Sequence, residues 1–115
     1  MEKLSEPSRE LVSRISREID FKDRLIGSNL HERAGVKTIS LYSLHELYML
    51  LSKPYPQIDL HKIESWIRTV IRDEELAAGI KTIMEQSGSD LEKLLHMREL
   101  IGLRLVQCRA QNGTP

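Results

Sequence analysis

Hydrophobic residues recur at intervals of three and four along most of this chain, which is the spacing of one face of an α-helix. The first run predicts a helix from residue 7 or 8 to residue 26, because Pro7 suits a first helical turn and Gly27 can end a helix. Its apolar positions are Leu11, Val12, Ile15, Ile19, Leu25 and Ile26. We therefore expect the chain to begin with an amphipathic helix.

The next stretch, residues 29–47, has a mixed pattern. A short helix over residues 29–34 would end at Gly35. Residues 36–40 would form an extended or irregular link, because three of the five are β-branched. A new helix is expected after Ser43, since Ser43 and Glu46 have the spacing of a capping box.

Three later helices are indicated by the residues at their starts. Asp59 can cap a helix with a wide apolar stripe. The acids Asp73, Glu74 and Glu75 interrupt that stripe and suit the positive end of a new helix, so we expect a bend or restart before Leu76, with a continuous helix as the alternative. Ser89 and Glu92 form a second capping box. The sequence thus predicts an all-α fold, a compact bundle of about five to six helices with no substantial sheet. Residues 1–106 form the single domain of this prediction, and residues 107–115 a disordered tail.

Composition and charge argue against a nucleic-acid-binding, membrane-spanning or secreted protein. Seventeen lysines and arginines balance 17 aspartates and glutamates, so no excess of positive charge marks a surface for nucleic acid. No apolar run approaches the roughly 20 residues that span a bilayer, and the N-terminus lacks the apolar segment of a signal peptide. The lone Cys108 excludes an intramolecular disulfide and fits a reducing compartment. We expect a cytoplasmic protein that does not enter membranes.

One short segment resembles the DNA-binding part of a known family. Residues 30–42 read LHERAGVKTISLY, which is similar to the turn region of tetracycline-repressor-type helix-turn-helix regulators, where a leucine-tyrosine pair follows a glycine-valine turn. The resemblance implies a recognition helix after Gly35. The DNA contacts would then be Lys37, Thr38 and Ser40. The alternative is that Gly35 only ends a helix and that Leu41 and Leu44 are core residues, which the capping box at Ser43 favours.

A broader resemblance covers residues 30–105. The chain contains, in order, the segments AGVKTISLYSLHEL, ESWIRTVIRDEELAAGI and SDLEKLLHMREL. This order is similar to a helical domain family of unknown function in bacteria and archaea, found alone or near sugar-transferring enzymes, in which a leucine-rich helix precedes a tryptophan helix and a restart similar to DEELA. The resemblance implies an order of helices and no particular chemistry. The core positions it implies are Trp66, Ile67, Leu76 and Ala77.

Catalytic and metal-binding motifs are absent from the sequence. It has no H-E-x-x-H, no pair of cysteines, no glycine-rich phosphate loop and no nucleophile elbow. His61, Glu64 and His96 are the residues over which a dispersed site could spread. Glu92 and His96 have the i,i+4 spacing that can hold one cation, but zinc sites need three or four converging donors. We therefore expect no enzyme activity, no metal and no cofactor.

Association with another macromolecule is the expected function. The apolar side of the first helix supplies the predicted interface, which consists of Leu11, Ile15 and Ile19. Mixed charges elsewhere on that helix indicate a solvated face and not a membrane-binding one. We expect a non-catalytic protein-binding or regulatory module and favour a homodimer. A DNA-binding regulator is the first alternative, and an enzyme or accessory subunit with a His/Glu site is the second.

Overall fold

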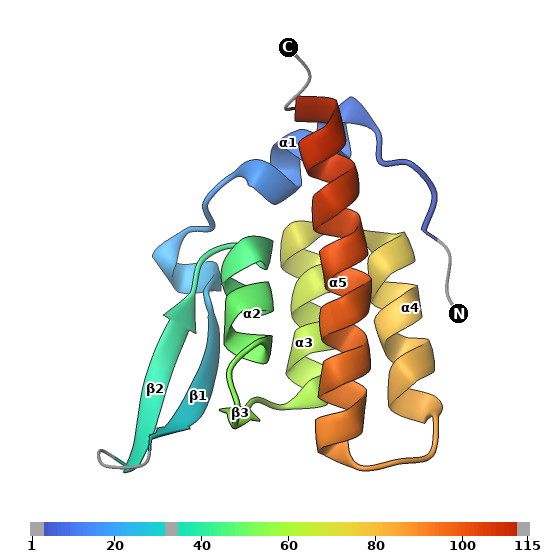
Figure 1. Ribbon diagram of the computed structural model, residues 1–115. Helices are drawn as coiled ribbons and strands as arrows, with labels where there is room; N and C mark the ends of the chain where they lie inside the picture. Colours follow the sequence, from blue (N-terminus) through green and yellow to red (C-terminus); the bar gives the residue numbers. More distant parts are fainter. Residues whose placement is uncertain (1–3, 32–34, 113–115) are drawn as a thin grey trace.

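The computed structural model describes residues 4–31 and 35–112, and it combines a helical layer with a small sheet (Figure 1). The first elements are α1 (Arg9–Ser16), the 3-10 turn η1 (Phe21–Asp23), β1 (Leu25–His31), β2 (Gly35–Leu41) and α2 (Leu44–Leu51). They are followed by β3 (Pro56–Gln57), α3 (Leu60–Trp66), the π-helical turn η2 (Ile67–Ile71), α4 (Glu74–Glu85) and α5 (Asp90–Asn112).

Helix α5 lies at the centre of the helical layer, where α1, α2 and α4 all pack against it. In Figure 1 the hairpin of β1 and β2 lies on the far side of α2 from α5. The strand order is β2-β1-β3, and both pairings are antiparallel. In the hairpin the pairs run from Leu25 opposite Leu41 to His31 opposite Gly35. Strand β1 is therefore central, and β2 is an edge.

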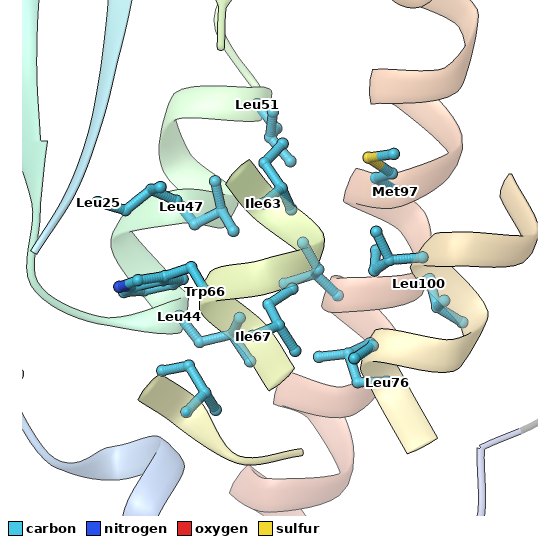
Figure 2. Packing of buried hydrophobic residues seen from close by; sticks show 14 of the residues in the cluster. Leu25, Leu44, Leu47, Leu51, Ile63, Trp66, Ile67, Leu76, Met97 and Leu100 are labelled. Carbon is cyan, nitrogen blue, oxygen red and sulfur yellow. The ribbon is translucent and has the colours of Figure 1, made fainter. Parts of the chain in front are cut away.

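A single apolar core joins the sheet to the helices, with members from β1, β2, all five α-helices of the described residues and η2. Figure 2 shows part of it, with Leu25 of β1 near Leu47 of α2 and Trp66 of α3. Burying this apolar surface is the main stabilising contribution to the fold. The four core positions implied by the broader resemblance, Trp66, Ile67, Leu76 and Ala77, are all buried. The placement of these residues in the core is thus confirmed.

The predicted helix starts are confirmed at four positions. Ser43, Asp59, Asp73 and Ser89 each accept a hydrogen bond from a backbone N–H two or three residues later, at 2.8–3.1 Å. Each bond satisfies an N–H group that has no partner within its own helix. Because Asp73 separates η2 from α4, the chain restarts a helix there and does not continue the previous one.

The prediction of an all-α fold without a sheet is wrong. Residues 25–31 and 35–41 pair as a hairpin, so neither a helix reaching residue 26 nor one starting at residue 29 is formed. Residues 32–34, the rest of that second predicted helix, lie outside the described residues. The extended link predicted at residues 36–40 belongs to β2 and is confirmed. Gly27 does not end a helix: a Cβ there would lie 2.6 Å from Leu50 Cδ2, so glycine allows β1 to approach α2 closely.

The predicted first helix is divided after Ser16. Arg17 adopts an extended backbone conformation, with φ −88° and ψ 144°. The N–H of Ile19 donates to the carbonyl of Tyr42 at 2.7 Å, which holds the chain beside the end of β2. The helical spacing from Leu11 to Leu25 therefore arose from separate elements that face the same core, whereas Ile26 is exposed.

Helix α5 continues beyond residue 106, the predicted end of the domain, and reaches Asn112. The side-chain amides of Gln107 and Gln111 donate to the carbonyls of Leu4 and Pro7, at 2.9 and 2.6 Å. These bonds tie the last turns of α5 to the N-terminal segment, so the predicted tail is helical as far as residue 112. Neither α5 nor any other helix of the described part is long and apolar enough to cross a membrane.

Candidate interaction surfaces

The three residues proposed as DNA contacts lie on strand β2 and not on a helix. Thr38 and Ser40 share the outer face of the sheet, whereas Lys37 lies on the opposite face, because side chains alternate along a strand. Lys37 and Thr38 are exposed, and Ser40 is half-buried, with its Oγ accepting a hydrogen bond from Arg24 Nε at 3.3 Å. The structure therefore does not bring the three side chains to one surface, and no recognition helix forms at these residues.

The predicted interface on the first helix packs within the chain itself. Ile15 belongs to the core, and Leu11 and Ile19 are half-buried against it. Helix α1 lies against α5. These side chains therefore have an intrachain role, and an interface between molecules at these positions stays a prediction.

Of the three residues predicted for a dispersed His/Glu site, the structure places only two around the same hollow. His61 and Glu64 line a hollow of about 760 Å³ bounded by α3, α4 and the start of α5, but His96 is not part of its lining. Glu64 is paired with Arg68, whose Nε lies 2.9 Å from Glu64 Oε2. Among residues 4–31 and 35–112, no group of three or more His, Cys, Asp and Glu side chains is arranged to hold a metal. The hollow has charges of both signs around it, so it favours neither an anion nor a cation.

A buried ionic network fastens α5 to the start of α4 and to the N-terminal segment. The Arg104 side chain is 1% exposed, and its Nε and Nη2 donate to Asp73 Oδ2 and Glu75 Oε1, each at 2.8 Å. Its Nη1 donates to the carbonyl of Ser5 at 2.7 Å. Burial alone would raise the pKa of Glu75, but hydrogen bonds from Ser5 and Arg104 together outweigh it and lower that pKa. Because the donors of Arg104 are used within the protein, we assign this network a structural role.

One residue has a strained backbone, and its surroundings give a structural reason. Arg72 follows η2 with φ 63° and ψ 43°, the left-handed region that a bulky residue rarely adopts. Its carbonyl accepts a hydrogen bond from Arg14 Nη2 at 3.0 Å, and the N–H of Asp73 closes the turn on the carbonyl of Ile67. The strained turn thus sets the position from which Asp73 caps α4 and meets Arg104.

We expect Cys108 to be almost unreactive in the folded protein. The thiol is buried, and desolvation raises its pKa, opposed by the nearby charge of Arg104. Since the thiolate is the reacting form, alkylation by iodoacetamide at pH 8 should be roughly 100-fold slower in buffer than in denaturing urea. Mass spectrometry of timed samples measures both rates. Similar rates in the two conditions would contradict the burial of this thiol.

Helix α5 carries an exposed apolar stripe on the side that faces away from the core. Leu91, Leu95, Leu103 and Val106 are each 40–59% exposed. At about 100° per residue they fall within one third of the helix circumference. The opposite side of α5 contributes buried residues to the core, among them Met97. Four large aliphatic side chains exposed on one side of a helix are a feature of contact surfaces.

The hairpin presents a second surface. Ile26 and Val36, on neighbouring strands, are 46% and 59% exposed on the outer face of the sheet. At the end of this face the guanidinium of Arg24 lies 3.8 Å from the centroid of the Phe21 ring. Strand β2 forms one edge of the sheet and has no strand partner on its other side among the described residues. In Figure 1 this edge is at the opposite end of the molecule from α4, so it is separate from the α5 stripe.

Sequence reasoning missed both surfaces, although signals for them exist. The segment 90–112 has apolar residues at more positions than a single core-facing stripe requires, and such an excess indicates a second contact face. The high share of β-branched residues at 36–40, three of five, is typical of a strand. Once that segment is placed in a sheet, its edge becomes a candidate surface.

Comparisons of the chain with models of protein families, with curated proteins and with solved structures found no match.

Proposed function

We propose that this chain is a non-catalytic, cytoplasmic protein-association module in which the apolar stripe of α5 joins two copies. The observation that carries the proposal is the exposure of Leu91, Leu95, Leu103 and Val106 along a helix whose other side is already in the core. Covering exposed aliphatic side chains lowers the free energy, because apolar surface is removed from water. The buried Cys108, which forms no disulfide, supports a reducing compartment.

The charges around the stripe support a second copy as the occupant. At about 100° per residue, Glu92 and Glu99 fall within the stripe, on the side of Leu103, and Arg98 and Arg109 fall at its other border. If two α5 helices pack in parallel about a twofold axis, the acidic side of one faces the basic side of the other. The chain as a whole has no net charge, so two copies do not repel each other at long range.

We do not extend the proposal to DNA. Lys37 is the only lysine or arginine in the described parts of the hairpin strands, and the other two candidate contacts are on the opposite face of the sheet. Affinity for DNA depends mainly on several basic side chains that neutralise phosphates together. A single lysine on a strand does not neutralise several phosphates.

Placing a carboxylate in the stripe should separate the two copies. We expect Leu95→Glu and Val106→Glu each to raise the dimer dissociation constant by roughly 100-fold, because an unpaired charge would be taken out of water. Sedimentation velocity over a concentration series measures the effect. Leu95 and Val106 are both exposed in the single chain, so the variants should keep their circular dichroism spectra and melting temperatures.

The matched control is Ala78→Glu, which places the same side chain on an exposed position of α4 and should leave the mass unchanged. Reversing one charge with Arg98→Glu should weaken the dimer, and adding Glu99→Arg should restore it if the helices are parallel. A wild-type chain that stays monomeric at millimolar concentration would refute self-association through α5.

A further inference from the structure

Strand β2 is an edge with unused hydrogen-bonding capacity. It pairs along all seven residues with β1, without a bulge or a proline, and no strand in the described part of the chain covers its other side. Alternate residues of an edge strand direct their backbone N–H and C=O groups away from the sheet. Residues 35–38 are exposed, so these groups can be reached by another extended chain.

The side chains next to this edge suit an extended segment. On the outer face, Val36 and Thr38 lie two residues apart along β2, and Ile26 lies further along the same face, opposite Ser40. Both β-branched and aliphatic side chains pack well across neighbouring strands. A partner residue opposite Val36 would cover apolar surface that is exposed in the single chain. The outer face therefore favours apolar, β-branched residues at alternate positions of the partner.

The single positive charge of β2 disfavours pairing with a second β2 strand and favours a partner with an acidic side chain. Lys37 is the only formal charge in β2, and it makes no ion pair or hydrogen bond with the described residues. Across from it on β1, the buried Asn29 has an Oδ1 atom that accepts no hydrogen bond within the same part of the chain. If two β2 strands were paired, their lysines would be brought close together, and lysine on an edge strand is a common protection against self-pairing. An acidic side chain on the same face would instead be attracted.

We infer that β2 is a docking edge for an extended segment of another protein, which adds a fourth strand and carries an acidic side chain opposite Lys37. Backbone hydrogen bonds would supply the affinity, and the acid opposite Lys37 together with an apolar residue opposite Val36 would supply the selectivity. This surface is independent of α5, so it goes beyond the proposed association of two copies.

The test uses peptides of defined sequence and the full chain labelled with ¹⁵N. The probe is a nine-residue peptide of alternating threonine and valine with a central aspartate, acetylated and amidated at its ends. We expect it to shift the amide signals of residues 35–41 and to bind about tenfold more tightly than the same peptide with a central lysine, because one exposed charge pair is attractive and the other repulsive. Methylating alternate peptide nitrogens should abolish the shifts, since a methylated amide cannot donate.

Two variants complete the design. Lys37→Glu should invert the preference, so that the lysine peptide binds more tightly, while Lys81→Glu on the exposed side of α4 should leave it unchanged. The peptides should bind Leu95→Glu as they bind the wild type, which separates this inference from the proposed role of α5. The inference is overturned if neither peptide shifts β2, if both bind equally, or if the β2 amides are protected in a concentration-dependent way without peptide.

Discussion

Arg104→Met should lower the free energy of unfolding by about 3–5 kcal/mol, the largest single effect we expect outside the apolar core. The substitution leaves the Asp73 carboxylate, whose side chain is 1% exposed, with the N–H of Leu76 as its one remaining donor among the described residues. Methionine has similar bulk, so the loss reflects an unpaired buried charge more than a cavity. Urea denaturation followed by circular dichroism gives the free energy directly.

The variant Arg104→Met/Asp73→Asn is the control for this explanation. Asparagine can still accept the hydrogen bond that caps α4, but it carries no charge. The double variant should therefore be more stable than Arg104→Met alone, by roughly 1–3 kcal/mol. A loss below about 1 kcal/mol in the single variant would mean that the pair contributes little beyond what a hydrophobic residue provides.

The same network gives a pH dependence with a defined sign. Because the pKa of Glu75 is lowered in the folded protein, its contribution to stability is complete above the ordinary range of a glutamate. That contribution is lost as the pH falls through the folded-state pKa. Glu75 is 42% exposed, so solvent keeps the effect small. Denaturation curves of the wild type and Glu75→Gln should therefore converge at acidic pH.

The sequence predicts helix starts well because they depend on local chemistry. Ser43, Asp59, Asp73 and Ser89 each cap the helix that follows, and the bond runs to a backbone group only two or three residues away. The formation of such a bond depends on the local backbone and not on distant parts of the fold. Positions fixed by neighbours in sequence were therefore found without any structure.

The sheet was not predicted because its determinants are distant in sequence. Leu25 and Ile26 continue the helical spacing of the first segment, yet their conformation is set by pairing with β2 and by the approach of Gly27 to Leu50 of α2. The bond from Ile19 to Tyr42 spans 23 residues. Tertiary contacts of this kind override the local helical pattern.

The candidate surfaces could be located only after the fold was known. Leu95 and Leu94 are adjacent and equally apolar, but one is 40% exposed and the other is buried. Hydropathy alone does not say which apolar residue faces the core and which remains for a partner. Likewise, the free edge of β2 is a property of the strand order and cannot be read from its seven residues.

The two proposed surfaces would reinforce each other. If α5 joins two copies, the dimer displays two β2 edges, and a partner with two extended acidic segments could engage both. The second contact would then form at a high effective concentration, which increases the overall affinity without any new contact. Leu95→Glu should remove this gain while leaving the binding of a single peptide unchanged.

Trp66→Ala should lower the free energy of unfolding by about 3–5 kcal/mol, because truncating a buried tryptophan combines lost burial with a cavity. Trp66 is 5% exposed and lies among Leu25, Leu44 and Leu47 in Figure 2, between the sheet and the helices. Its Nε1 also donates to the carbonyl of Asp23 at 2.8 Å, which holds η1 and the start of β1 against α3. Since Trp66 is the only tryptophan, circular dichroism replaces fluorescence as the readout.

Trp66→Phe separates the two contributions of this side chain. Phenylalanine keeps most of the ring but cannot donate to Asp23, so we expect a loss of about 1–2 kcal/mol and faster hydrogen exchange in β1. Peptide binding at β2 should weaken in proportion, because the docking edge is held in place through β1. Equal losses for alanine and phenylalanine would show that the hydrogen bond, and not the packing of the ring, holds the sheet on the helical layer.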